Sequence, residues 1–434
     1  MLDRRRLIGG FLPGLGLATL LPGCRSDPAP GGTPPAEAAR RAEGLDPGPD
    51  PDFEALLTAS PAGNPYAPLG AALRGLEAGR QGRALVLMLG DSHTAFPRMA
   101  ERLRELLQVR FGAVGPGRMP PGRAQSSFVP AGITLIQEGS WSTAHALRAA
   151  TPGPFGLAGY RLTGSQAGDH LSLASADPRG FDRLHLTLQC GPESGSFRLI
   201  GAGIPEAPRA TRTAAPRLRL IRLDLPPGQR SVTLELMGDG PVTLLGWGVD
   251  RRGRGAMVES FGINGATLAT LDNRDPAIVA RELSVAPPAL IILEYGTNEA
   301  TDRDFDPAAY GLALSRRIAA LRAASPRSGI LLMGAPDAGR PIRRGRGACP
   351  VTPLPALAAV RSTQRRVAAA ERVGFFDWAE EVTGGLCRLP SLARATPPLM
   401  RPDLVHFTTD GYRLTAERLH ANLLRGAGLG GAAA

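Results

Sequence analysis

The sequence predicts an α/β protein: a parallel sheet covered by helices on both faces and interrupted by a β-rich insert. Three observations predict this fold. Residues 84–89 are six consecutive apolar residues that run into Gly-Asp-Ser, as expected for a strand buried on both faces. Strand and helix patterns alternate again after Met257. Between these parts, residues 114–253 hold short strand-like runs separated by Gly, Pro and Asp, which suggest a β-sandwich.

The elements follow in order along the chain. A helix is expected near residues 69–79, then the strand 84–89 and a helix over 98–109. The expected strands of the insert are 170–173, 184–190, 196–200, 217–225, 231–237 and 242–249. The C-terminal part reads as strand 289–293, helix 307–324, strand 329–333, helix 355–373, strand 375–377 and helix 409–424. We therefore expect one α/β domain, residues 66–113 and 254–434, opened after its first strand–helix unit to accept residues 114–253.

The composition excludes several classes of protein. All 50 basic residues are arginine, because the chain of 434 residues contains no lysine. A Schiff-base lysine and a phosphate-binding P-loop lysine are therefore excluded. The net charge of +11 favours anionic partners, but aromatic residues are only 5% of the chain and no basic run is interleaved with them. No nucleic-acid partner is expected.

The N-terminus has the pattern of an export signal. Arg4-Arg5-Arg6 precedes an apolar segment, residues 7–21, that is too short for a permanent membrane anchor. The arginine cluster also suits twin-arginine export. The segment ends in Leu21-Pro22-Gly23-Cys24, which resembles a bacterial lipobox, although Pro22 is not favoured there. Residues 1–24 are expected to be a signal peptide, with lipidation of Cys24 and a membrane-anchored periplasmic protein as the result. An ordinary cleaved signal peptide with an incidental cysteine is the alternative.

The region after the signal is expected to be a flexible tether. Residues 25–65 are rich in Pro, Gly, Ala and Asp and have no sustained periodicity. Three cysteines remain further along the chain. In an exported protein Cys349 and Cys387 are the candidate disulfide pair, and Cys190, at the end of an apolar strand, is expected to be a buried free thiol. No Cys-x-x-Cys or His/Cys cluster is present, so no metal site is expected.

Ser92 and an Asp-x-x-His pair are candidates for nucleophilic catalysis. Ser92 follows a buried strand on a tight turn into a helix, which is where open α/β sheets place their ligands. Gly-Asp-Ser alone would equally suit a helix cap. Near the C-terminus, Asp403 and His406 lie on a turn before a helix, so that both side chains can reach one site. A serine needs a base within hydrogen-bond reach and a group that orients that base. His93 is an alternative base, but consecutive side chains point apart, which favours a packing or substrate-facing role.

Two further loops could supply donors to a developing negative charge. Ser260-Phe261-Gly262-Ile263-Asn264-Gly265 re-enters the α/β domain, and a buried strand ends in Gly296-Thr297-Asn298. A glycine allows close backbone approach, and an asparagine amide can donate to an oxyanion. Either loop alone would also suit a simple turn.

Taken in order, these four segments resemble the four blocks of the SGNH (GDSL-type) hydrolases. The resemblance spans residues 84–424 and implies a flavodoxin-like sheet, with Ser92 as nucleophile, His406 as general base and Asp403 orienting it. It also implies an oxyanion hole made by the N–H groups of Ser92 and Gly265 and the side chain of Asn298, with no cofactor. Glu299 stands where these hydrolases commonly have Asp, at a supporting position.

The spacing of the blocks resembles one subgroup. Ser92 and Gly265 are 173 residues apart, which leaves room for a domain, and Gly265 and Asn298 are 33 apart. Together with Gly-Asp-Ser-His and Val-His-Phe-Thr-x-x-Gly-Tyr, this looks like the bacterial peptidoglycan O-acetylesterases, in which the insert is similar to a carbohydrate-binding β-sandwich. The resemblance implies a serine esterase acting on an acetylated envelope glycan, of unknown oligomeric state. Two alternatives remain: an acetyltransferase that uses a sugar hydroxyl as acceptor, and a catalytically idle glycan-binding protein.

Overall fold

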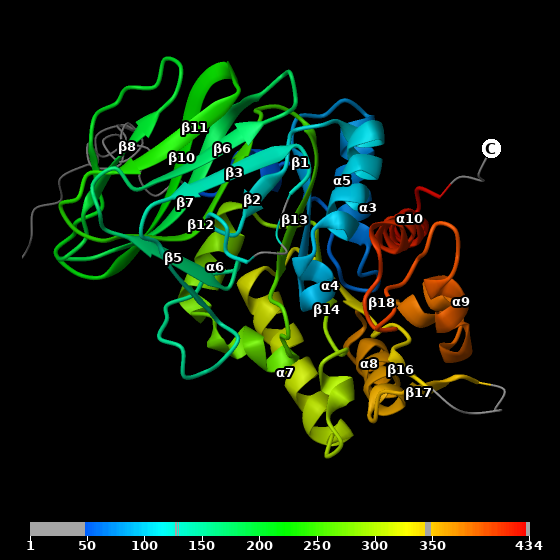
Figure 1. Ribbon diagram of the computed structural model, residues 1–434. Helices are drawn as coiled ribbons and strands as arrows, with labels where there is room; N and C mark the ends of the chain where they lie inside the picture. Colours follow the sequence, from blue (N-terminus) through cyan, green and yellow to red (C-terminus); the bar gives the residue numbers. More distant parts are fainter. Residues whose placement is uncertain (1–47, 126–127, 129, 343–348, 431–434) are drawn as a thin grey trace, which may run out of the picture.

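The computed structural model describes residues 48–125, 128, 130–342 and 349–430. Its centre is a five-stranded parallel sheet in the order β13-β1-β14-β15-β18. These strands are β1 (Arg83–Gly90), β13 (Gly255–Gly262), β14 (Leu290–Glu294), β15 (Gly329–Met333) and β18 (Gly374–Phe376). The predicted α/β fold class, with additional antiparallel sheets, is confirmed (Figure 1).

Helices cover both faces of the sheet because every central strand is apolar on both sides. Val86 and Met88 pack with one set of helices, whereas Leu87 and Leu89 pack with the other, as expected for the period of two in a strand. The first set is α3 (Ala67–Glu77), α5 (Arg98–Phe111) and α10 (Thr409–Gly426). The second set is α6 (Pro276–Val285), α7 (Pro307–Ala324) and α8 (Leu357–Glu371). No helix in the described part of the chain is long and apolar enough to cross a membrane.

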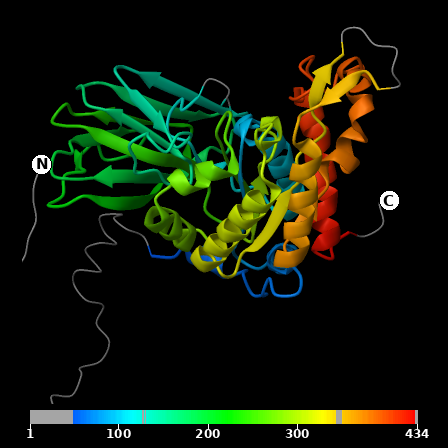
Figure 2. The ribbon, with the colours of Figure 1, turned by 90° about the horizontal axis from the view of Figure 1, so that it is seen from below.

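The insert forms two antiparallel sheets around a separate core (Figure 2). The first has the order β10-β7-β12-β5-β4, with β2 also on β12, and the second has the order β3-β6-β11-β8-β9. The strands of the first sheet are β2 (Gly117–Met119), β4 (Ser142–His145), β5 (Tyr160–Gly164), β7 (Phe181–Cys190), β10 (Arg217–Gln229) and β12 (Val242–Asp250). Those of the second are β3 (Ile133–Glu138), β6 (His170–Ser175), β8 (Ser196–Ile200), β9 (Arg209–Ala210) and β11 (Ser231–Leu236). Leucine-rich alternation, as in Leu184-x-Leu186-x-Leu188, directs one face of each sheet into this core.

The insert is fastened to the parallel sheet by buried ion pairs. Arg83 of β1 contacts Asp250 of β12 at 3.0 Å, and Arg118 of β2 contacts Glu259 of β13 at 2.7 Å. All four charges lie close to a partner of opposite sign, which compensates for the loss of their hydration. The insert therefore has a defined position relative to β1 and β13.

The smaller elements lie around the sheet. They are α2 (Pro51–Glu54), α4 (Ser92–Ala95), η1 (Leu268–Asn273), η2 (Glu299–Thr301), β16 (Gly339–Pro341), β17 (Val351–Pro353), η3 (Ala379–Thr383), η4 (Leu386–Arg388) and α9 (Leu389–Ala393). β16 and β17 form an antiparallel hairpin.

The structure differs from the expected tether over residues 50–57, whereas residues 58–65 have no helix or strand and no buried residue. Asp50 caps α2, and Phe53, Leu56 and Leu57 are buried against the core of the α/β domain. Three apolar side chains within five residues are enough to fix this segment, although its composition resembles that of a linker. The expected signal peptide, including Cys24, lies outside the described residues.

Candidate active site

The carboxyl ends of β13, β1 and β14 bring together the motifs of Gly265, Ser92 and Asn298. Gly90, at the end of β1, lies between Gly262 of β13 and Glu294 of β14. A side chain at Gly90 would collide with Thr94 and with Glu294, so only glycine fits between these strands. Asp91 then caps α4 by accepting a hydrogen bond from the N–H of His93 at 2.9 Å. Ser92 therefore begins a helical turn at the edge of the sheet where α/β proteins bind their ligands.

Ser92, His406 and Asp403 form a hydrogen-bonded chain. Ser92 Oγ lies 3.1 Å from His406 Nε2, and His406 Nδ1 lies 2.9 Å from Asp403 Oδ2. Asp403 Oδ1 also accepts from the N–H groups of Val405 and His406, each at 3.0 Å. Leu404 has a φ of 56°, and this left-handed residue turns the chain so that Asp403 folds back toward the imidazole.

The electrostatics of Asp403 suit the orientation of a histidine. Burial alone would raise the pKa of this carboxyl group, but the hydrogen bonds from His406 and Val405 outweigh it and bring the pKa below its ordinary value. Asp403 is therefore ionised at neutral pH. A charged carboxylate at Nδ1 keeps the proton on that nitrogen and leaves Nε2 free to accept the serine proton.

His93 packs beneath this chain. Its Nδ1 lies 2.9 Å from the hydroxyl oxygen of Tyr412, and its ring centroid lies 5.4 Å from that of His406 and 5.0 Å from that of Trp378. Complete burial, followed by the nearby charge of His406, lowers the pKa of His93 to about 3. The geometry thus gives His93 a packing role, and no hydrogen bond joins it to Ser92 in the described residues.

The three expected oxyanion donors lie on adjacent loops. The N–H groups of Ser92 and Gly265 have no acceptor among the residues that the structure describes. Gly265 has a φ of 77°, which a side chain would disfavour. The amide of Asn298 already has acceptors, because its Nδ2 donates to the carbonyl of Ala266 at 2.8 Å and to Asp91 at 3.3 Å. An oxyanion would replace or share one of these acceptors.

Glu299 connects the two oxyanion loops. Its carboxylate accepts from the N–H of Leu268 at 2.6 Å and from the N–H of Gly296 at 3.0 Å. Burial raises the pKa of Glu299, and these two hydrogen bonds oppose the rise. In the sequence, Glu299 is noticeable only because SGNH hydrolases commonly have Asp at this position. In the structure, its longer side chain accepts hydrogen bonds from both Leu268 and Gly296.

Two buried carboxyl groups lie below the nucleophile, and the motif analysis missed their pairing. Glu294 accepts from Thr94 Oγ1 at 2.9 Å and from the N–H of Asp91 at 3.3 Å. Burial is the main cause that raises the pKa of both Asp91 and Glu294. Repulsion from Glu299 adds to the rise at Asp91, and repulsion from Asp91 adds to the rise at Glu294. An acidic residue ending the strand Leu-Ile-Ile-Leu-Glu is the only sequence signal for this pair.

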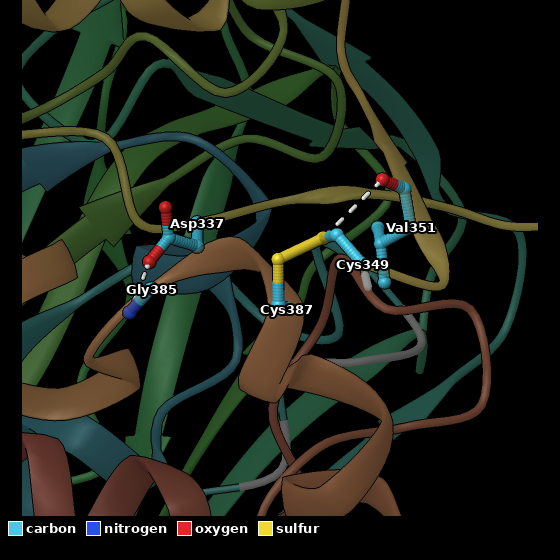
Figure 3. The surroundings of a disulfide bond; sticks show 5 residues. All are labelled: Asp337, Cys349, Val351, Gly385 and Cys387. Carbon is cyan, nitrogen blue, oxygen red and sulfur yellow. Dashed lines mark hydrogen bonds between the residues drawn. A yellow bond between two sulfur atoms is a disulfide. The ribbon is translucent and has the colours of Figure 1, made fainter. Parts of the chain in front are cut away.

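A disulfide joins the segment before β17 to η4 (Figure 3). Cys349 and Cys387 are joined, and the N–H of Gly385 donates to Asp337 at 3.0 Å beside them. The β16–β17 hairpin next to Cys349 contacts the turn of the Asp-x-x-His motif, because the N–H of Gly339 in β16 donates to the carbonyl of Leu404 at 3.2 Å. Cys190 is free and buried. The described residues contain no group of three or more His, Cys, Asp or Glu that could hold a metal ion.

A serine–histidine–aspartate chain at the edge of a parallel sheet is the arrangement that serine hydrolases use. The comparisons with known proteins support the SGNH (GDSL-type) hydrolase family. Residues 231–414 match the model of the GDSL-like lipase/acylhydrolase family, which covers the blocks of Gly265, Asn298 and His406.

One solved structure extends the comparison over most of the chain. A structure of a peptidoglycan O-acetylesterase is similar with a TM-score of 0.70 and 23% sequence identity, over 85% of this chain and 97% of that one. Family two carbohydrate esterases from Clostridium thermocellum and Cellvibrio japonicus each show 15% identity, over 67% of this chain and 100% or 99% of theirs, with TM-scores of 0.28. No curated protein matches the chain.

Proposed function

We propose that the protein is an exported serine esterase that removes O-acetyl groups from peptidoglycan or a related envelope glycan. The observation that carries the proposal is the 3.1 Å contact between Ser92 Oγ and His406 Nε2, with Asp403 on the other side of the imidazole. The similarity in fold to a peptidoglycan O-acetylesterase over 85% of the chain supports the choice of substrate.

The reaction follows from the positions of these groups. Ser92 Oγ attacks the acetyl carbonyl carbon while its proton passes to His406 Nε2. The negative charge that develops on the carbonyl oxygen is stabilised by the N–H groups of Ser92 and Gly265 and by the Asn298 amide. The C–O bond to the sugar then breaks, and His406 returns the proton to the leaving sugar oxygen. Water, deprotonated by His406, attacks the acetyl-serine carbonyl carbon; the bond to Ser92 Oγ then breaks, His406 returns the proton to Ser92 Oγ, and acetate is released.

The proposal also assigns roles to the insert and to the N-terminal segment. Residues 114–253 form a β-rich module, which we assign to glycan binding, and Cys24 would carry a lipid that keeps the enzyme at the membrane. Such an anchor would place the enzyme next to its polymeric substrate. An insert fixed by the Arg83–Asp250 and Arg118–Glu259 contacts would present the glycan in one orientation.

The test compares the purified protein with Ser92→Ala. Hydrolysis of p-nitrophenyl acetate and acetate release from O-acetylated peptidoglycan should both fall by a factor of about 10⁴ or more, as for other triad serines. Ser231→Ala is the matched control, because Ser231 is exposed at the start of β11 in the insert. Retention of p-nitrophenyl acetate hydrolysis by Ser92→Ala would refute the nucleophile.

The same assay separates the reaction types. Quantitative release of free acetate is expected, and transfer of acetyl groups to an added oligosaccharide in its place would identify an acetyltransferase. Glycan binding without turnover of any ester would instead indicate an idle hydrolase domain.

A further inference from the structure

Arg401 lies directly opposite His406 in a short hairpin. The N–H of Arg401 donates to the carbonyl of His406 at 2.8 Å, next to an antiparallel bridge between Met400 and Phe407. Residues that face each other in an antiparallel pair project their side chains from the same face. Met400 and Phe407 are buried in the core, so the next pair, Arg401 and His406, projects from the other face, toward Ser92.

A second contact brings the Arg401 side chain close to the nucleophile. Its guanidinium carbon lies 5.8 Å from the ring centroid of Phe96. Phe96 follows Ser92 by one helical turn, with its N–H donating to the Ser92 carbonyl at 3.2 Å. The contact between Arg401 and Phe96 therefore runs beside the contact between His406 and Ser92, because both join the same hairpin to the same turn.

The charge of Arg401 has no counter-ion among the residues that the structure describes. Arg401 is exposed, and no carboxylate of the described residues lies within ion-pair distance of it. The nearby Asp403 is engaged by His406. Arg98, which also lies over Phe96, at 5.7 Å, is paired with Glu101 at 2.6 Å. Of the two arginines on this ring, only Arg401 has a charge that is free to attract an anion.

We propose that Arg401 is a substrate-binding residue that selects acetylated glycans carrying a carboxylate near the ester. This inference rests on the proposed function and specifies its substrate. A planar guanidinium binds a carboxylate through two parallel hydrogen bonds, and the contact with the Phe96 ring leaves the charge of Arg401 unneutralised. The carboxylate can come from two sources in peptidoglycan: the lactyl group of the sugar itself, or a peptide attached to that sugar.

Three probes distinguish these sources. They are O-acetylated N-acetylmuramic acid, its lactyl methyl ester, and an O-acetylated N-acetylmuramoyl peptide with free carboxylates. The intact protein should hydrolyse at least one carboxylate-bearing probe with a kcat/KM about tenfold above that of the methyl ester, as for a charged hydrogen bond. The probe that is preferred over the methyl ester identifies which carboxylate is recognised, the lactyl group or the peptide. The preference should weaken as the NaCl concentration is raised.

Variants of Arg401 test the residue. Arg401→Gln should abolish most of the preference through an increase in KM for the carboxylate-bearing probe, and Arg401→Lys should retain part of it as a point charge. Arg316→Gln makes the same change of charge at an exposed position of α7 that has no ion pair, and it should retain the full preference.

The results that would overturn the inference differ from those that would overturn the proposed function. An equal decrease in kcat/KM for neutral and carboxylate-bearing probes in Arg401→Gln would mean that Arg401 acts on His406 or on the fold, while the esterase assignment stands. An intact protein that hydrolyses p-nitrophenyl acetate but none of the three probes would refute the proposed glycan substrate, and the inference with it.

Discussion

The carboxylate of Glu299 accepts a hydrogen bond from the N–H of Leu268 at 2.6 Å. This contact ties the loop after β13 to the loop after β14, and the second oxygen of Glu299 holds Gly296 at 3.0 Å. Two of the proposed oxyanion donors, Gly265 and Asn298, lie on the loops that are joined in this way. Their spacing therefore depends on a side chain that does not touch the reacting atoms.

Shortening or neutralising Glu299 should lower kcat. Glu299→Asp is too short to reach both N–H groups, and Glu299→Gln presents an amide donor to one of them. A displacement of about 1 Å in a catalytic group can cost up to about 100-fold in rate, so we expect a decrease in kcat of about 10- to 100-fold with little change in KM. Steady-state kinetics on p-nitrophenyl acetate measure it. The control is Glu380→Gln, which changes an exposed glutamate and should leave kcat unaltered. A change in the Glu299 variants that is confined to KM or to thermal stability would contradict the positioning role.

Removing the amide of Asn298 should weaken catalysis more than Glu299 variants do. We expect Asn298→Ala to lower kcat by about 10²- to 10³-fold, the usual effect of losing one oxyanion donor. Single-turnover kinetics on the same ester would report the acylation step directly. A kcat within threefold of the parent protein would mean that the amide serves only to hold Ala266 and Asp91.

His93 should make the protein sensitive to acid. The pKa of His93 is about 3 in the folded protein and about 6.5 in the unfolded chain, so only the unfolded state binds the proton between these values. Stability is therefore lost as the pH falls from 6.5 toward 3. Between pH 7 and pH 5 the loss amounts to about 2 kcal/mol in the free energy of unfolding.

Urea unfolding of the parent protein and of His93→Asn at pH 7 and pH 5 measures this loss in the free energy of unfolding. The variant should be less stable at pH 7, because it loses the packing of the imidazole against Trp378. The difference between the two proteins should narrow by about 2 kcal/mol at pH 5. A constant difference across this range would show that His93 takes up its proton in the folded state.

Reduction of the disulfide should make the β16–β17 hairpin, which contacts the Asp-x-x-His turn, more mobile. Cys349 and Cys387 close a loop with a sequence separation of 38, for which chain entropy gives about 4 kcal/mol of stabilisation. Hydrogen exchange should rise in β16 and β17 on addition of dithiothreitol, and more weakly at Leu404, whose carbonyl accepts from Gly339. The double variant Cys349→Ser/Cys387→Ser should show raised exchange that no longer responds to the reductant. Unchanged exchange in the reduced parent protein would contradict this role.

The α/β pattern could be predicted because the core strands are apolar without interruption. Leu85 to Leu89 and Ile291 to Leu293 are buried on both faces, and such runs are recognised without knowledge of tertiary contacts. Residues 50–57 could not be predicted in the same way, because Phe53, Leu56 and Leu57 form no repeating pattern and gain their burial only from the finished core.

Motif order predicts which residues should meet at the site, but it does not predict the contacts that hold them. The candidate residues Ser92, Asp403 and His406 follow from residue types and spacing. The pairing of Asp91 with Glu294, the two loops held by Glu299 and the contact of Arg401 with Phe96 depend on how separate strand ends and hairpins approach in space. None of these contacts has a short sequence signature.

The place of the insert also sets the order in which the chain can fold. In the sheet, β1 lies between β13 and β14. Arg83 of β1 pairs with Gly255 of β13, which follows the whole insert in the sequence, and Leu290 of the other neighbour, β14, comes later still. The insert has its own two sheets and core by Asp250, so it can fold during synthesis while β1 has no neighbours. Ser92 is therefore among the first ordered residues to be made and among the last to reach its final surroundings.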